Sequence, residues 1–211
     1  MKNKLLIIGA SGHGKVVADV ALKMNKWSTI EFLDDDGSIK IQMGLEIIGK
    51  SEDACKYVDN YDLFVAIGNN GVRKKIQEKL EAAGASIPVL IHPSSIIGKE
   101  VELDMGTIVM AGTVINCCTK IGRGCIINTG STIDHDNNIN NYVHLSPGVH
   151  LAGGIKIGDL SWIGIGSSLI QGINVGQNSI IGAGSVIIKS IPENCIAVGN
   201  PGQIIKNNKA E

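Results

Sequence analysis

One periodic pattern constrains the fold of this 211-residue chain more than any other feature. Starting at Ile91 and stepping by six, all seventeen positions through Ile187 are Ile, Leu or Val. A period of six fits neither the 3.6-residue turn of an α-helix nor the heptad of a coiled coil. Six is a multiple of two, so in an extended chain these side chains all face the same way.

A chain that turns a corner after every six residues, with these aliphatic side chains inward, forms a stacked triangular prism. Three such segments close one coil of about eighteen residues, which predicts a parallel β-helix built from hexapeptide repeats. The residue directly after each repeated aliphatic is often Gly, Asn or Asp, as at Gly98, Gly122 and Asn128. We expect these residues to occupy the corners, which other residue types resist.

The first 85 residues follow a different pattern, in which short apolar runs alternate with helical spacing. Strands are expected at 4–8, 30–36 and 61–70, and helices at 15–24 and 71–84. This order is typical of a small parallel α/β domain. The predicted organisation is therefore a Rossmann-like domain at 1–85, a β-helix at 86–190, and a C-terminal segment at 191–211.

Composition excludes several function classes. The formal net charge of −1 gives no reason to expect a nucleic acid or an anionic membrane as partner. The apolar run at the N-terminus is too short for a signal peptide or a membrane span. The five cysteines are odd in number and lack C-x-x-C spacing, which favours free thiols in a reducing cytoplasm and no zinc site. Cys117, Cys118 and Cys125 are expected to pack inside the coils.

A glycine-rich loop follows the first expected strand and precedes the first helix. Backbone N–H groups at such a helix N-terminus form an anion site. Acidic and amide residues that end the neighbouring strands are expected to line the same edge of the sheet. The candidate nucleotide-binding residues are Gly9, Ser11, Gly12, His13, Gly14, Asp34, Asp35, Gly68, Asn69 and Asn70.

Two other interpretations of this loop remain open. Its glycines can simply serve turns in a packing domain, or the domain can bind NAD in an oxidoreductase. The spacing G-x-x-G-x-G differs from the dinucleotide pattern G-x-G-x-x-G, and the appended hexapeptide repeat also counts against NAD.

Three of the five histidines fall within residues 131–150. His144 and His150 each precede an inward aliphatic residue, so both are expected on the outer surface. His135 is flanked by Asp134 and Asp136. An imidazole with a pKa near 6.5 can accept a proton at physiological pH, and a carboxylate on its other ring nitrogen fixes the tautomer.

Several segments carry a resemblance to a known family over nearly the whole chain. They are "IIGASGHGKVVADV", "FLDDD", "AIGNN-x-x-R-K-K-I", "IHPS", "STIDHD" and "VGNPGQ". In this order they resemble the sialic-acid O-acetyltransferase and UDP-amino-sugar N-acetyltransferase family. The resemblance implies a left-handed β-helix of the hexapeptide acyltransferase type.

The resemblance also implies an activity: direct acetyl transfer from acetyl-CoA to a nucleotide-linked amino sugar, at its 4-amino group, without a metal. His135 is then the general base and Asp136 its modulator. The family has a glutamate where Asp136 stands, so Asp134 is a rival partner for the ring. O-acetylation of sialic acid or a related hydroxyl, and a non-catalytic trimeric sugar-nucleotide scaffold, remain alternatives.

The donor site is expected along stacked, side-chain-poor backbone. Two glycine-rich stretches lie eighteen residues apart and should stack directly, and "VGNPGQ" resembles the family's adenine-side segment, with Lys206 in place of its usual lysine. By resemblance His144 contacts the acyl donor. The candidate acetyl-CoA residues are His144, Gly164, Ile165, Gly166, Gly182, Ala183, Gly199 and Pro201.

Spacing also predicts an assembly. His135 and His144 are nine residues apart, half of one coil, and therefore lie on different sides of a single prism. They can meet only where prisms of two chains lie side by side. Proteins of the family that this chain resembles are usually trimers, so we expect a homotrimer with sites shared between subunits.

Overall fold

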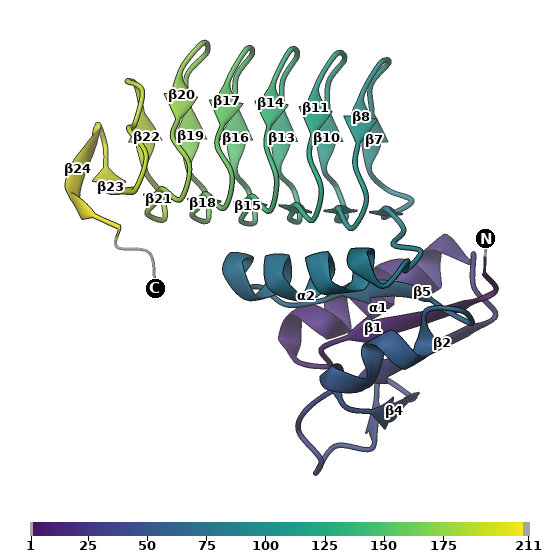
Figure 1. Cartoon of the computed structure of the whole chain (residues 1–211). Coiled ribbons are helices and arrows are strands. Elements are labelled where there is room, and N and C mark those ends of the chain that lie inside the picture. Colours follow the sequence, from purple (N-terminus) through teal and green to yellow (C-terminus); the bar gives the residue numbers. More distant parts are fainter. Residues whose placement is uncertain (1, 209–211) are drawn as a thin grey trace. The chain divides into compact units, whose positions relative to one another are not determined.

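The structure is a computed structural model, and residues 2–208 are described. Within these residues the chain divides into two compact units, one that ends at Pro93 and one that begins at Ser94. Figure 1 shows an α/β ribbon for the first unit and a stack of coils for the second. Within the described residues, no helix has the length and apolar character needed to cross a membrane.

The first unit is built on a five-stranded sheet in the order β3-β4-β2-β1-β5. All of its strand pairs are parallel except β3 with β4. The strands are β1 (Lys4–Ile8), β2 (Thr29–Leu33), β3 (Ile41–Gln42), β4 (Leu45–Gly49) and β5 (Asp62–Val65). The helices are α1 (Gly12–Met24), the 3₁₀ helix η1 (Ser51–Tyr57) and α2 (Asn70–Ala82).

The apolar runs of β1 and β5 are buried, as continuous hydrophobic strands of a parallel sheet should be. Helix α1 buries Val17, Ala18, Val20 and Ala21, the small aliphatic residues of one face. The β3–β4 hairpin was not predicted. Its turn residues Met43 and Gly44 both have positive φ. Asn-Gly is the usual sequence signal for such a turn, and Met-Gly is not.

The second unit is a parallel β-helix whose coils are formed by strands of two residues each. Three walls result: β7-β10-β13-β16-β19-β22, β8-β11-β14-β17-β20, and the wall that contains β9, β12, β15, β18, β21, β23 and β24. The bounds of the strands on the three walls and of β6 are β6 (Leu90–Ile91), β7 (Ile96–Ile97), β8 (Glu102–Leu103), β9 (Ile108–Val109), β10 (Val114–Ile115), β11 (Lys120–Ile121), β12 (Ile126–Ile127), β13 (Thr132–Ile133), β14 (Asn138–Ile139), β15 (His144–Leu145), β16 (His150–Leu151), β17 (Lys156–Ile157), β18 (Trp162–Ile163), β19 (Ser168–Leu169), β20 (Asn174–Val175), β21 (Ile180–Ile181), β22 (Val186–Ile187), β23 (Cys195–Gly199) and β24 (Gly202–Asn207).

The eighteen-residue register places like residues above one another. Ile115 pairs with Ile133, and Ile133 pairs with Leu151. Every six-step residue from Val109 to Ile187 is at most 3% exposed, so these aliphatic side chains form the core of the prism. The predicted hexapeptide β-helix is confirmed.

The corner chemistry differs from the expectation. Left-handed backbone recurs every six residues, but three positions after each core aliphatic, as at Gly106, Gly112 and Gly130. The glycines directly after the core residue serve clearance between coils: a Cβ on Gly98 would lie 2.7 Å from the Cys117 nitrogen, and one on Gly158 would lie 2.4 Å from that of Gln177. Those glycines are therefore required by the close stacking of coils.

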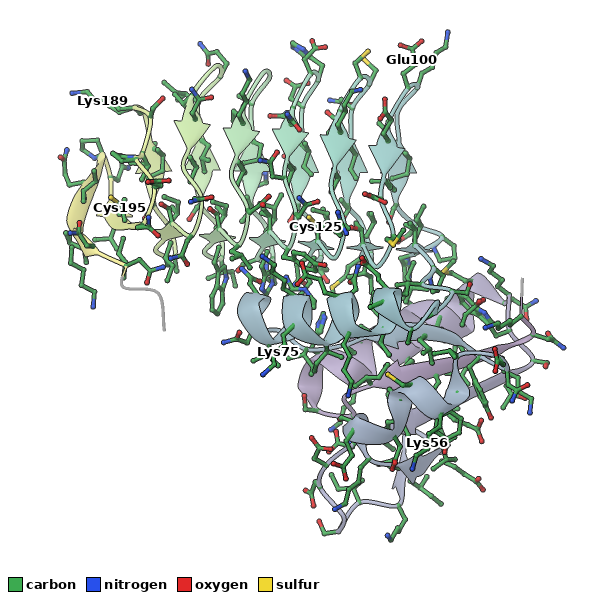
Figure 2. The ribbon with its side chains drawn as sticks, viewed as in Figure 1. Lys56, Lys75, Glu100, Cys125, Lys189 and Cys195 are labelled. Atoms are coloured by element: carbon green, nitrogen blue, oxygen red, sulfur yellow. The ribbon has the colours of Figure 1, made fainter. Side chains whose placement is uncertain are left out.

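The cysteines also depart in part from the expectation. Cys125 is fully buried in a coil, whereas Cys117 and Cys118 are exposed. The pair lies on an outward turn, with Cys118 at a left-handed position (φ 61°), so neither thiol enters the core. Figure 2 shows Glu100, which stands eighteen residues before Cys118 at the equivalent turn of the preceding coil, with its side chain pointing away from the coil.

Candidate functional site

His135 and Asp136 occupy one outward turn of the β-helix, between β13 and β14. The His135 Nδ1 atom lies 2.7 Å from Asp136 Oδ2, and both side chains are more than half exposed. Asp136 is at a left-handed position with φ 57°. An imidazole so held keeps its Nε2 atom on the other edge of the ring, away from the carboxylate.

The two carboxylates that flank His135 make different contacts with it. The hydrogen bond to Asp136, with a smaller charge effect from Asp134, raises the pKa of His135 above its ordinary 6.5. Asp134 Oδ1 accepts hydrogen bonds from the His135 backbone N–H and from Asn116 Nδ2, each at 2.9 Å. Asp136 therefore contacts the ring, whereas Asp134 holds the backbone of the turn.

Asn137 fixes the same turn from inside the prism. It is 1% exposed and stands where Thr, Ser or Cys stands in most other coils. Its Nδ2 donates to the Asp134 carbonyl at 2.6 Å and to the Ala152 carbonyl at 3.1 Å, while its Oδ1 accepts from the Ile155 N–H at 2.9 Å. One buried amide thus joins the His135 turn to the next coil.

His144 lies on β15, on a different wall from the two that meet at the His135 turn. Its ring stacks on Trp162 of β18, with centroids 5.3 Å apart and an interplanar angle of 7°. Its Nε2 lies 3.3 Å from Asn128 Nδ2. His144 was expected on the surface, but only 9% of it is exposed, and the indole covers one face of its ring. His150 is exposed, as expected, and its Nδ1 lies 2.8 Å from Thr132 Oγ1.

A shallow, mainly apolar hollow of about 490 Å³ begins at His144 and runs over the next two coils. Trp162 contributes one side, and its Nε1 donates to Ser146 Oγ at 2.7 Å. Five of the residues proposed for the acetyl donor line it: His144, Gly164, Ile165, Gly182 and Ala183. The lining also includes Asn128, Ser146, Pro147, Ile180 and Ile181.

The other three donor candidates lie outside the lining of this hollow. Gly166 is a left-handed turn residue with φ 67°. Gly199 pairs with Gly202 where β23 turns into the antiparallel β24, and Pro201 lies in that turn. Lys206 pairs with Ile196 in the same hairpin and is exposed.

The glycine loop of the first unit is a close-packed turn. Gly9 has φ 101°, and a Cβ on Gly14 would lie 2.0 Å from the Gly9 carbonyl oxygen, so helix α1 can begin here only if residue 14 is glycine. A Cβ on Gly12 would meet nothing within 4 Å. The Ser11 side chain makes no hydrogen bond at the start of α1. Gly12 and Ser11 therefore face open space.

Asp34 and Asp35 both bind backbone in this unit. Asp34 Oδ2 accepts from the Ala10 N–H at 2.6 Å, and its Oδ1 accepts from the Asp36 N–H at 2.9 Å. Asp35 Oδ1 accepts from the Ser51 N–H at 3.0 Å. Asp34 therefore shapes the glycine loop directly, a role that the sequence did not indicate.

His13 and Arg73 meet at the carboxyl edge of β1 and β5. Arg73 is 1% exposed, and its Nη1 donates to the carbonyls of Ile67 at 2.9 Å and Gly68 at 3.0 Å. Its Nη2 donates to Asn70 Oδ1 at 2.7 Å, while Asn69 caps helix α2 by accepting from the Val72 N–H. Burial, with the added charge of Arg73, lowers the pKa of His13 to about 4.

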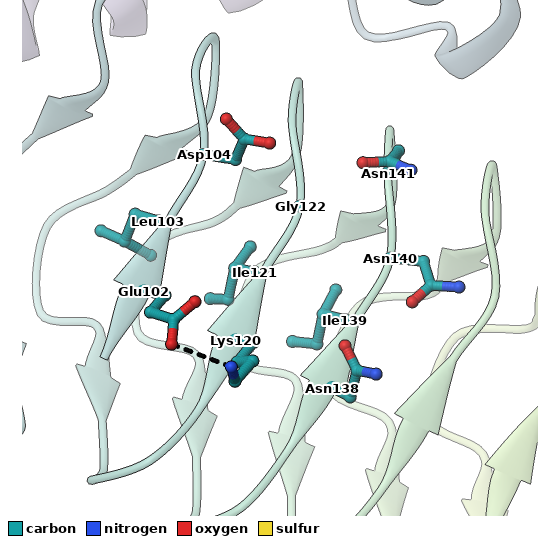
Figure 3. Close-up of a pocket in the computed structure, with 10 residues that line it drawn as sticks. All are labelled: Glu102, Leu103, Asp104, Lys120, Ile121, Gly122, Asn138, Ile139, Asn140 and Asn141. Carbon is teal, nitrogen blue, oxygen red and sulfur yellow. Dashed lines mark ion pairs between the residues drawn. The ribbon is translucent and has the colours of Figure 1, made fainter. Parts of the chain in front are cut away.

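A second hollow of about 390 Å³ lies on the β8-β11-β14 wall (Figure 3). Its lining is mixed polar and apolar, and it includes an ion pair of 2.9 Å between Glu102 and Lys120. None of the candidate residues lines it. Within residues 2–208 there is also no cluster of three or more His, Cys, Asp or Glu side chains that suits a metal ion.

Comparison with known proteins assigns the family. The PglD N-terminal domain model matches residues 4–80. Over 97% of this chain and all of the other, the fold matches the acetyltransferase domain of PglB from Neisseria gonorrhoeae, with a TM-score of 0.94 and 38% identity. The chain belongs to the PglD-like sugar acetyltransferase family.

Two further relatives carry substrate names. Perosamine N-acetyltransferase from Caulobacter crescentus, solved as a histidine mutant with CoA and GDP-perosamine, matches with a TM-score of 0.92 and 33% identity over 97% of each chain. UDP-N-acetylbacillosamine N-acetyltransferase from Bacillus subtilis is 37% identical over 115 residues. That match spans 53% of this chain and about half (52%) of the Bacillus protein. The second unit of this PglD-like protein is a left-handed β-helix, as the sequence resemblance implied.

Sequence reasoning missed four residues that the geometry brings to these sites. Arg73 stands in the quoted "AIGNN-x-x-R" motif but was given no role. Asn128 and Asn137 looked like ordinary repeat positions. Trp162 follows His144 by eighteen residues, so the coil period alone would have placed it on the same wall.

Proposed function

We propose that this PglD-like protein transfers an acetyl group from acetyl-CoA to the 4-amino group of a nucleotide-linked amino sugar. The observation that carries the proposal is the His135 Nδ1–Asp136 Oδ2 contact of 2.7 Å on an exposed turn. Two named relatives, one acting on perosamine and one named for UDP-N-acetylbacillosamine, support an amine as the acceptor.

In the proposed reaction His135 acts as the general base. Its Nδ1–H donates to Asp136, which leaves the Nε2 lone pair for the proton of the sugar amine. As that proton moves to Nε2, the amine nitrogen forms a bond to the thioester carbonyl carbon. The C–S bond then breaks, and the departing sulfur takes the proton from the imidazolium, which restores neutral His135. Asp136 stabilises the imidazolium between these two steps.

The hollow beside His144 suits the acyl donor. Its lining is apolar and poor in side chains at Gly164 and Gly182, as an extended pantetheine arm requires. The His144 ring, held flat against Trp162, is placed in our proposal at the thioester carbonyl, where a hydrogen bond stabilises the developing oxyanion. Asn128, 3.3 Å from His144 Nε2, orients that ring.

The glycine loop of the first unit is our proposed site for the nucleotide part of the acceptor. Backbone N–H groups at the start of α1 attract phosphate. Gly12 and Gly68 leave open space around them, since a Cβ on either would meet nothing within 4 Å. Neutral His13 and buried Arg73 stand at the same edge of the sheet.

We further propose that the acetylation site is shared between neighbouring subunits of a homotrimer. Within one chain His144 lies on a different wall from the two that meet at the His135 turn, and the hollow beside His144 does not include His135 in its lining. A base from one prism and a donor site from its neighbour would complete the site.

The decisive assay measures thiol release from acetyl-CoA with a panel of UDP-, dTDP- and GDP-linked 4-amino sugars, with free sialic acid as the hydroxyl acceptor. We expect turnover with at least one 4-amino sugar nucleotide, and loss of that turnover by at least about 100-fold in His135→Ala. If only sialic acid is turned over, the acceptor is a hydroxyl group and the proposed amine acceptor is wrong. No thiol release with any acceptor would favour a sugar-nucleotide-binding scaffold.

A further inference from the structure

We propose that Gly153 is a positioning residue for His135. The lack of a side chain at this position provides the space in which the imidazole ring lies beside Asp136. The inference rests on the proposed role of His135 as base. It states that Gly153, a residue of the next coil, determines where the His135 ring lies.

The coil register brings the two residues together. Gly153 follows His135 by eighteen residues, so it lies one coil further along the same corner, and it is buried. A Cβ built on Gly153 would lie 2.7 Å from both Cε1 and Nε2 of His135, and 3.2 Å from Nδ1. Real Cβ atoms do not approach other atoms so closely. The ring therefore rests directly on the Gly153 backbone.

The turn itself cannot yield to such a contact at low cost. The Gly154 N–H donates to the His135 carbonyl at 2.9 Å. Asn137 binds the carbonyls of Asp134 and Ala152, one from each coil. Because these bonds hold the two backbones at a set separation, a side chain at residue 153 would displace the exposed His135 ring instead.

The predicted displacement is chemically specific. The colliding atoms belong to the edge of the ring that carries Nε2, the proposed proton acceptor. The contact with Asp136 raises the pKa of His135. Rotation of the ring away from Gly153 would break this contact and so lower that pKa. The backbone at Gly153 lies outside the left-handed region, so alanine fits the local conformation without strain. At Gly158, by contrast, a Cβ would meet the backbone of Gln177.

The test is Gly153→Ala in the full-length protein, with Gly37→Ala as the matched control. A Cβ on Gly37 would meet nothing within 4 Å, and that backbone is not left-handed. We expect Gly153→Ala to keep the wild-type melting temperature and KM for acetyl-CoA, and to lower kcat by about 10- to 100-fold, the effect of misplacing a catalytic group by about 1 Å. The pKa of His135, followed by NMR titration without substrates, should fall. Gly37→Ala should change none of these.

The outcomes separate this inference from the proposed function. A wild-type kcat and an unchanged His135 pKa in Gly153→Ala would refute it. So would a lowered kcat with an unchanged His135 pKa and a raised KM for acetyl-CoA, because Gly153 would then act on the donor. If the pKa falls in Gly153→Ala while His135→Ala acetylates normally, the positioning contact stands and the base assignment fails.

Discussion

Asp136 Oδ2 lies 2.7 Å from His135 Nδ1, and Asp136 itself holds a left-handed backbone conformation. Glycine occupies most of the equivalent turn positions, which recur every six residues. A non-glycine residue in this conformation costs roughly 1 kcal/mol. Five other turns also carry a non-glycine residue at this position: Glu100, Cys118, Tyr142, Leu160 and Asn178. The left-handed backbone therefore does not by itself distinguish Asp136, and our proposal for its part in catalysis rests on its contact with the His135 ring.

Replacing Asp136 by Asn should lower the pKa of His135. The carboxylate raises that pKa in the folded protein, so its removal moves the acid limb of the kcat/KM profile to lower pH. Because the folded-state pKa is raised, the pair's stabilisation is full below the unfolded pKa of 6.5 and is lost as pH rises through the folded value. We expect kcat to fall about 10-fold from loss of the oriented tautomer. Steady-state pH profiles measure the shift.

Asp134→Asn is the control for that experiment. Asn keeps a side-chain oxygen that can accept from the His135 N–H and from Asn116, so the turn is preserved. Only the smaller charge effect on the His135 pKa is lost. An equal or larger pKa shift in Asp134→Asn would identify Asp134 as the principal partner.

Replacing Trp162 by Ala should weaken the donor site. The indole stacks on His144 and bounds the apolar hollow. Loss of a stacked ring pair costs roughly 0.5–1.5 kcal/mol, so we expect KM for acetyl-CoA to rise about 2- to 13-fold. Trp162→Phe keeps a stacked ring but loses the Nε1 hydrogen bond to Ser146. Its KM for acetyl-CoA should lie between those of the wild type and of Trp162→Ala. An unchanged KM in the Ala variant would remove Trp162 from the donor site.

Mixing two inactive variants tests the shared site. In a trimer formed from equal amounts of His135→Ala and His144→Ala chains, random assembly leaves about a quarter of the sites with both histidines intact. Co-expression or joint refolding should therefore restore about that fraction of wild-type activity. If each site lies within one chain, no mixture regains activity. The mass in solution, from sedimentation equilibrium, checks the assembly independently.

Acid should destabilise the protein in part through His13. Burial and the charge of Arg73 lower the pKa of His13 from 6.5 to about 4. Between these two pH values, His13 is therefore protonated in the unfolded state and neutral in the folded state. The free energy of unfolding should therefore decrease as pH falls from 6.5 towards 4. His13→Gln, which carries no titratable group, should show a shallower decrease in urea titrations over this range. Parallel curves for both proteins would contradict a lowered pKa.

A pair of glycine substitutions should isolate backbone strain in the β-helix. Gly130 has φ 67°, and a Cβ there would meet nothing within 4 Å, so Gly130→Ala adds strain and no clash. We expect it to lower the free energy of unfolding by about 1–2 kcal/mol, the cost of left-handed backbone for alanine. Gly37→Ala, with equal space and no positive φ, should leave stability unchanged or raise it slightly. Equal melting temperatures for the two variants would show that the turn relaxes.

Much of the architecture was accessible from periodicity. The six-step aliphatic series predicted the β-helix, and stepping by eighteen from Ile115 correctly predicts its partner Ile133. The same arithmetic links His144 to Trp162. The pattern succeeds because every core side chain must face inward, and a repeated burial requirement leaves a repeated residue type.

The short β3–β4 hairpin and the burial of His144 were not accessible in this way. β3 has only two residues, one of them exposed, so it leaves no apolar run. The surface position expected for His144 followed correctly from its outward direction, but its covering by Trp162 depends on the rotamers of two side chains on adjacent coils.

The linear chain was sufficient for the coil, its core and the approximate location of the chemistry, because alternation and period report which side of the backbone is buried. It could not distinguish Asp134 from Asp136, assign Asp34 to the Ala10 N–H, or show that His135 rests on Gly153. Those relationships depend on the separation between coils and on side-chain directions within a turn. Both quantities exist only after the backbone has closed on itself, and they decide whether an imidazole beside two carboxylates is held in place.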